Sequence, residues 1–161
     1  MAEFRETLAR LGLGGIATYI QSGNAVFRAA GKPADLASQI SEAILRDFGF
    51  QTDVLVLSEA ALAAAIRDNP FPDAENDPAN LYLHFAFDAI DPDEPKALSA
   101  LATQGERLRV LGRVLYLYAP RGVGRSNLAA RLTRVITTPM SARNFRSCRK
   151  ILDLAHDMRT T

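Results

Sequence analysis

Hydrophobic residues recur along this chain at two spacings, every second residue in short runs and every third or fourth residue in longer ones. The longer spacing predicts helices and the shorter one predicts strands. Helices are expected over residues 3–11, 34–48, 58–67, 93–102 and 124–136, with a last helix capped by Thr138-Pro139 or by Ser141 and running to about residue 158. Strands are expected over residues 18–21, 25–28, 52–57, 81–87, 106–111 and 114–119, with hairpin turns at 22–24 and 112–113.

The order of these elements nearly repeats. The first half reads α-β-β-α-β and the second reads β-α-β-β-α, so each is one strand short of the β-α-β-β-α-β unit. We therefore predict an α+β fold of two ferredoxin-like halves at 1–69 and 80–161, joined by an acidic linker at 70–79. The first half lacks its opening strand and the second shows no obvious closing one. Because the opening strand is central in such a sheet, its absence exposes backbone groups on its neighbours. Met1 is thus expected to be an internal methionine or a cut site.

Composition narrows the class of protein. The 161 residues are 48% hydrophobic, with one cysteine and two histidines. These values exclude a disordered chain, a disulfide framework and a zinc site built from several cysteines. No apolar run approaches the ~18 residues of a membrane span. We expect a cytoplasmic protein without a cofactor and without a membrane partner.

Charge is unevenly distributed. Residues 51–100 contain ten acids and two bases, whereas residues 101–161 contain twelve bases and three acids. From Arg107 to Lys150 there are eleven basic residues and no acidic one. This asymmetry allows an anionic partner, either a nucleic acid or a phosphorylated small molecule. The alternative is that the acidic middle pairs with the basic end, within the chain or in a homodimer.

Two segments are candidates for anion binding. The turn at 120–127 has two glycines between a strand and a helix start and is flanked by arginines, which suits a phosphate, although it is not a Walker A loop. In the last predicted helix, three bases spaced three and four apart form one stripe. The candidate anion-binding residues are Arg121, Gly122, Gly124, Arg125, Ser126, Arg143, Asn144, Arg146 and Lys150. Alternatively, the glycines serve backbone geometry and Asn144 serves the helix start.

Catalytic groups are not apparent. Cys148 lies on an apolar helix stripe and is expected to be buried, and His84 is expected to be exposed or hydrogen-bonded on the outer sheet face. No nucleophile, base and orienting group can be assembled, so no catalytic or metal-binding residue is predicted. An enzyme acting on a phosphorylated substrate would need a base that the sequence does not reveal.

The acidic loop and one sheet face allow further interpretations. Acidic residues alternate at 73, 75 and 77, and they are expected to be solvated or to cover basic residues. Aromatic residues alternate on the strands at 81–87 and 114–119, and arginines at 107 and 109 could join them. RNA-recognition sheets stack bases on such a face, but packing against another face is the alternative.

Four motifs in order resemble one bacterial family. They are TYIQSGNAVF at 18–27, NPF at 69–71, LYLYAPRGVGRS at 115–126, and SARNFRS at 141–147 followed by KIL at 150–152. Together they resemble the family called "domain of unknown function 1697", which usually has tryptophan where Phe145 stands. The resemblance implies two ferredoxin-like α+β subdomains, preceded by an apolar strand that this sequence lacks. It implies no particular reaction.

Overall fold

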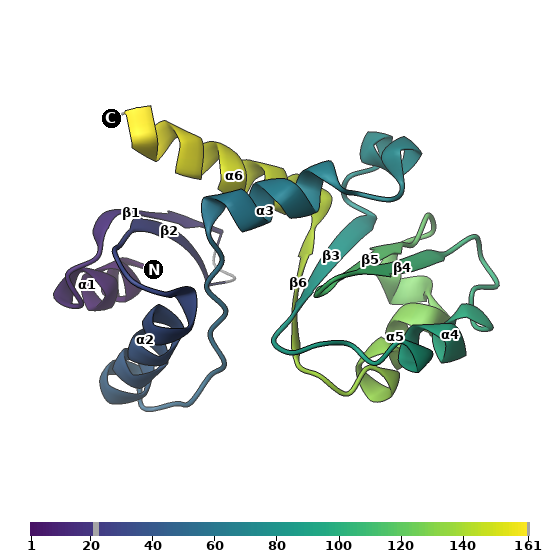
Figure 1. Cartoon of the computed structure of the whole chain (residues 1–161), viewed down its shortest axis with the longest axis horizontal. Helices are drawn as coiled ribbons and strands as arrows, with labels where there is room; N and C mark the ends of the chain where they lie inside the picture. The colour runs from purple at the N-terminus through teal and green to yellow at the C-terminus, as the bar shows by residue number, and fades with distance from the viewer. Residues whose placement is uncertain (21–22, 161) are drawn as a thin grey trace. The chain divides into compact units, whose positions relative to one another are not determined.

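The computed structural model describes residues 1–20 and 23–160, in which six α-helices and two antiparallel sheets form an α+β fold (Figure 1). The chain divides into two units, Met1–Ala63 with Lys150–Thr161, and Ala64–Arg149. This division differs from the expected boundaries, because the acidic segment at 70–79 joins the second unit and the last residues join the first. No helix in the described ranges is long and apolar enough to cross a membrane.

The first unit is built around a two-stranded sheet of β1 (Gly14–Tyr19) and β2 (Asn24–Arg28). Helices α1 (Ala2–Arg10) and α2 (Pro33–Phe48) contribute Leu8, Ile40 and Ile44 to a core that also takes residues from both strands. The two helices thus lie on one side of the hairpin (Figure 1). The turn predicted at 22–24 lies partly outside the described residues.

The prediction of a strand over residues 52–57 is wrong. Val54 and Val56 of this segment pack against the first core, as the alternating pattern requires. However, within the described ranges no backbone N–H of residues 53–57 donates to a backbone carbonyl, so the segment belongs to no sheet. In a ferredoxin-like sheet its neighbour would be the opening strand. The described residues contain no strand before β1, and none of their strands pairs with this segment.

The second unit begins in α3 (Glu59–Arg67), where Ser58 Oγ accepts a hydrogen bond from the Ala61 N–H as expected of a cap. The acidic segment follows as a short 3-10 helix, η1 (Pro72–Asn76). Four antiparallel strands then form a sheet in the order β4-β5-β3-β6. They are β3 (Leu81–Ala86), β4 (Arg107–Leu111), β5 (Val114–Tyr118) and β6 (Met140–Asn144).

β6 supplies the closing strand that the sequence analysis did not find. It pairs with β3 from Tyr82–Asn144 to Ala86–Met140. The expected start of the last helix is consequently wrong, since α6 (Phe145–Thr160) begins only after β6. Ser, Ala, Arg and Asn are poor strand formers, so the pattern of this segment did not indicate a strand.

Different helices pack against the two faces of the four-stranded sheet. Helices α4 (Asp93–Ser99) and α5 (Asn127–Val135) lie on one face, and Leu98, Leu128 and Leu132 form its core with Leu115 and Leu117 of β5 (Figure 1). On the other face the end of α3 provides cover, since the Tyr116 hydroxyl donates to the Ala65 carbonyl oxygen at 2.7 Å.

The register separates the two aromatic pairs that were considered for one surface. Tyr116 and Tyr118 lie opposite Leu83 and Leu81 of β3, whereas Tyr82 and His84 lie opposite Leu117 and Leu115. The two pairs therefore point to opposite faces, because side chains alternate along a strand. Arg107 and Arg109 do lie opposite Tyr118 and Tyr116. Tyr116 is only 1% exposed, so this face does not present it for stacking on a base.

Candidate functional site

The start of α5, which the glycine-rich turn was expected to offer to a phosphate, already holds a carboxylate of the chain. Ser126 is the N-cap residue, and its Oγ accepts a hydrogen bond from the Ala129 N–H at 3.1 Å. The same hydroxyl donates to Glu106 Oε1 at 2.8 Å, and the Gln104 N–H donates to Glu106 Oε2 at 2.7 Å. Glu106 thus lies where a helix start attracts an anion.

The environment of Glu106 favours its charged form. The side chain is buried, with 6% of the residue exposed, and burial by itself would raise the pKa of the carboxyl. Hydrogen bonds from Gln104 and Ser126, together with the positive charge of Arg121, outweigh burial and hold the pKa below its ordinary value. An external phosphate at this position would have to displace a buried, hydrogen-bonded carboxylate.

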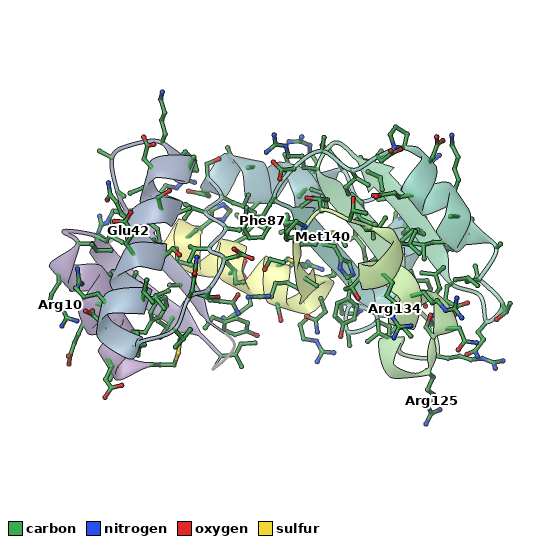
Figure 2. All side chains as sticks on the ribbon, turned by 90° about the horizontal axis from the view of Figure 1, so that it is seen from below. Arg10, Glu42, Phe87, Arg125, Arg134 and Met140 are labelled. Carbon is green, nitrogen blue, oxygen red and sulfur yellow. The ribbon has the colours of Figure 1, made fainter. Side chains whose placement is uncertain are left out.

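The glycine-rich turn itself places two arginines at the surface. Gly122 has a φ of +88°, a conformation that L side chains rarely adopt, so the turn requires glycine there for its geometry. Gly124 lies in the short 3-10 helix η2 (Val123–Arg125). Arg121 and Arg125 are exposed, and the Arg125 side chain extends away from the ribbon (Figure 2).

The predicted stripe Arg143, Arg146 and Lys150 does not exist as one helix face, because Arg143 lies in β6 and only the other two lie in α6. Arg143 Nη1 donates to the Ala142 carbonyl oxygen at 2.7 Å and to Ser141 Oγ at 3.3 Å. Its guanidinium is therefore engaged near its own strand. The stripe was predicted from a helix that was expected to begin too early.

Three further predicted residues have different surroundings. The Oδ1 atom of Asn144 accepts a hydrogen bond from the Ser147 N–H at 2.9 Å, so Asn144 serves the start of α6. Arg146 is exposed, and its backbone N–H donates to the Pro78 carbonyl oxygen at 3.2 Å. Lys150 belongs to the first unit, whereas the other predicted residues belong to the second. The second unit therefore keeps Arg121, Arg125 and Arg146 as exposed arginines from the predicted set.

The acidic segment engages one arginine from the edge of the sheet. Arg107 forms a two-pronged ion pair with Asp73, with Nη1–Oδ1 and Nη2–Oδ2 distances of 3.0 and 2.7 Å. Its guanidinium also lies over the rings of Phe71 and Tyr118, 4.8 and 5.0 Å from their centroids. The Asp73 pKa is lowered, first by its hydrogen bond with Arg107.

The only thiol of the chain is buried, and one histidine is half-buried. Cys148 is 0% exposed, as its helix stripe predicts, and burial raises the pKa of its thiol to about 12. The prediction for His84 is wrong, because its Nε2 is buried and has no hydrogen-bond partner within the described ranges. Burial lowers the pKa of His84 to about 4. Neither group fits a nucleophile or a base at neutral pH.

The other titratable groups of the described residues form ion pairs and hydrogen bonds rather than a metal site. His156 Nε2 lies 3.0 Å from Glu59 Oε1, and Arg159 Nη2 lies 3.1 Å from the same oxygen. In the part of the chain that the structure describes, no three His, Cys, Asp or Glu side chains are placed to hold a metal ion.

Two features of the second unit were not predicted from the sequence. Glu106 is the only acidic residue between Glu94 and Asp153 and directly precedes a basic strand, and this position was the available signal. The outer face of α5 was also not considered. It presents Asn127, Arg131 and Arg134, whose spacing of four and three residues was the available signal.

Arg125 of η2 and the arginines of α5 differ from Arg107 in their partners. Arg125, Arg131 and Arg134 are exposed, and none of them forms an ion pair with any described residue. α5 and the turn before it are therefore one place in the second unit where exposed arginines form no ion pair with a described residue. This arrangement can attract and hold anionic groups.

Comparison with known proteins identifies relatives of this chain. Among curated proteins, none matches it. A solved structure, that of the conserved bacterial protein SP0830 from Streptococcus pneumoniae, has 23% sequence identity and a TM-score of 0.70, covering 96% of this chain and 88% of that one. At this identity the likeness shows the shared fold. Residues 1–116 match the family described as "Protein of unknown function (DUF1697)". The chain therefore belongs to the DUF1697 family.

Proposed function

We propose that the protein is a binding module for an anionic ligand, a nucleic acid or a phosphate-bearing metabolite, and that its second unit carries the binding surface. From the predicted set, Arg121, Arg125 and Arg146 form the accessible part of this surface, and Gly122 and Gly124 shape the turn that carries the first two. Ser126 and Asn144 contribute by capping α5 and α6.

The observation that carries the proposal is the absence of acidic residues from Arg107 to Lys150. Proteins that bind anions keep basic side chains unneutralised, because a local carboxylate would compete with the ligand. Arg125 of this segment is exposed and has no ion pair with a described residue. Arg forks also match the oxygens of a phosphate better than an ammonium group does.

Binding should be tested with ligands of the two classes. A labelled single-stranded RNA and a set of nucleotides and sugar phosphates would be titrated against the protein at two salt concentrations. For contacts with several phosphates, the affinity is expected to fall by about tenfold or more between about 50 and 200 mM salt. Arg146→Ala and the pair Arg121→Ala/Arg125→Ala should weaken binding. Arg143→Ala should weaken it as well if the guanidinium leaves its backbone contact for the ligand.

A matched control is the pair Arg5→Ala/Arg28→Ala, which removes the same charge from the first unit. This pair should leave the affinity within about twofold of that of the unmodified protein. Absent binding of every ligand, or binding that does not respond to salt, would contradict the proposal.

The alternative function is that of a structural or interaction protein, in which the acidic middle pairs with the basic end. The two-pronged Asp73–Arg107 ion pair favours it. Asp73→Arg should then lower stability, and Arg107→Asp combined with Asp73→Arg should restore most of the loss. For a partly exposed pair we expect an effect of no more than about 1 kcal/mol. A double variant as unstable as the single one would count against this alternative.

We also propose that both halves are ferredoxin-like, the first without its opening strand. The second unit supports this with the element order β3-α4-β4-β5-α5-β6 and the strand order β4-β5-β3-β6. For the first half, the support is a two-stranded sheet, two helices and the extended residues 52–57 on a common core. The assignment would be tested by an experimental structure of the protein with an apolar strand added before α1. The added strand should pair with residues 52–57.

A further inference from the structure

The outer face of α5 contains a hollow that none of the predicted anion-binding residues lines. Its volume is about 330 Å³, and it lies within the second unit. Five residues line it, namely Leu101, Asn127, Ala130, Arg131 and Arg134. The first follows α4 and the other four belong to α5, so the hollow lies where the end of one helix meets the side of the next.

The polar rim of the hollow is suited to an anion. Asn127, Arg131 and Arg134 are spaced four and three residues apart, which places them on one face of the helix. All three are exposed, and neither arginine forms an ion pair with another residue in the described ranges. Their guanidinium groups can therefore each give two parallel hydrogen bonds to a phosphate without first leaving a carboxylate.

The hollow has room for a ligand larger than a bare phosphate. Pockets for small molecules have volumes of about 300–1,000 Å³, and this hollow falls at the lower end of that range. Leu101 and Ala130 provide an apolar floor, and Leu101 also packs against the core of the unit. A guanidinium plane can stack on a base, and an asparagine amide can give and accept hydrogen bonds at a base edge.

The start of the same helix is not an equivalent place for the ligand. The buried Glu106 carboxylate already accepts the hydrogen bond of Ser126 there. An incoming phosphate would meet a like charge at the helix start, whereas it meets two unpaired guanidinium groups on the helix side. Charge and accessibility both direct the ligand to the side of α5.

We infer that this hollow binds one nucleotide unit, with its phosphate on Arg131 and Arg134 and its base or sugar on the floor formed by Leu101 and Ala130. The inference rests on the proposed anion-binding function and names the ligand class and the residues. A free nucleotide and a nucleotide within a single strand present the same phosphate and base, so the experiment must distinguish these two sources.

The test compares ADP, inorganic phosphate and a labelled single-stranded RNA in calorimetric and anisotropy titrations. The pair Arg131→Ala/Arg134→Ala should lower the affinity for the nucleotide or for RNA by about tenfold or more. For RNA, the slope of log affinity against log salt should also fall by about 1.4, which corresponds to two lost contacts on a single strand. Inorganic phosphate should bind more weakly than ADP, because it cannot use the apolar floor.

Two further variants make the result specific. Ala130→Glu places a carboxylate in the hollow without removing an arginine, and it should abolish nucleotide binding. Arg5→Ala/Arg109→Ala removes two exposed arginines outside the hollow and should leave the affinity within about twofold. Far-UV circular dichroism and the melting temperature would show that each variant is folded, and the glutamate variant keeps the test valid if the double alanine variant is not.

The outcomes separate this inference from the proposed function. Loss of nucleotide affinity in both Arg131→Ala/Arg134→Ala and Ala130→Glu supports the inference. Whichever of ADP and RNA binds more tightly identifies the source of the nucleotide. Loss only in Arg121→Ala/Arg125→Ala and Arg146→Ala overturns the inference and leaves the proposed function intact. If no phosphate-bearing ligand binds at low salt, both are overturned.

Discussion

Residues 52–57 of the first unit and β6 of the second unit are both extended, but only β6 lies beside a strand with which it can pair. The first segment, TDVLVL, has a β-branched residue at every second position and packs Val54 and Val56 against its core. The second, MSARN, has little strand propensity, but each of its residues has a partner in β3. A segment of low strand propensity therefore forms a strand where a neighbouring strand has a free edge. A segment of high strand propensity remains unpaired where no strand lies next to it.

The largest expected effect comes from removing a backbone donor in each segment. The Phe87 N–H donates to the Pro139 carbonyl at 3.0 Å, and hydrogen-bonded pairs alternate along an antiparallel ladder, so Ser141 and Phe85 form the next such pair. Ser141→Pro should lower the free energy of unfolding by about 3 kcal/mol. Asp53→Pro removes an N–H that donates to no backbone carbonyl in the described part of the chain, and it should cost less than about 1 kcal/mol.

Urea denaturation followed by circular dichroism would measure both changes. Equal losses in the two variants would show that residues 52–57 take part in a hydrogen-bonded ladder, and the comparison would then fail.

Acid should lower the stability of the four-stranded sheet through His84. This residue lies in β3, the strand between β5 and β6. Burial lowers the pKa of His84 to about 4 from the ordinary value of 6.5. Below pH 6.5 the imidazole of His84 is therefore protonated in the unfolded chain but still neutral in the folded sheet, and stability falls as the pH falls towards 4. The loss amounts to about 3 kcal/mol when the pH is below both values, and it is absent above the unfolded pKa.

The measurement compares the unfolding free energy of the protein and of His84→Leu at pH 7 and at pH 4.5. Because carboxylates also titrate in this range, the relevant quantity is the difference between the two pH dependences. Identical dependences would mean that the imidazole is accessible to protons in the folded sheet.

Packing, rather than hydrogen bonding, should account for the contribution of residues 52–57. Val56 is half-buried against the first core, so Val56→Ala should lower the free energy of unfolding by about 1 kcal/mol. Leu57 is exposed, and Leu57→Ala should change it by less than about 0.5 kcal/mol. Thermal unfolding would distinguish the two, and a larger effect at Leu57 would reverse the assignment of the packed face.

The smallest effect should come from improving the weak strand. Ser141→Thr adds strand propensity and keeps the hydroxyl that accepts from Arg143 Nη1, so it should raise stability by about 0.5 kcal/mol. The reverse change, Thr52→Ser, lowers propensity in a segment outside any sheet and should have no measurable effect on the melting temperature. A loss at Thr52 as large as the gain at Ser141 would indicate that propensity acts without a neighbour.

Local patterns predicted much of the fold. The apolar spacing of α2 and the serine cap of α3 led to elements close to those observed, and the hairpin of β4 and β5 turns at the expected Gly112-Arg113. The failures share one cause. Residues 52–57, β6 and the start of α6 depend on which strand has a neighbour, and that is a contact between distant parts of the chain.

The candidate site also depends on contacts between distant parts of the chain, which local patterns do not predict. The residue pattern located the arginine-rich segment and the turn that leads into a helix, but it placed Arg143 on the wrong element. It could not show that the Glu106 carboxylate, twenty residues before Ser126, would reach the start of α5. Nor could it show that the end of α4 would meet the side of α5 and form a hollow beside Arg131 and Arg134.

From its residues alone, this chain is determined to be an α+β protein with an uninterrupted basic segment, because side-chain periodicity and charge are properties of neighbouring positions. Only the tertiary structure decided which extended segments pair, which carboxylate occupies the start of α5 and which arginines remain without a partner. These outcomes depend on groups that meet across long stretches of chain, and hydrogen bonds and charges act over distances in space regardless of their separation in sequence.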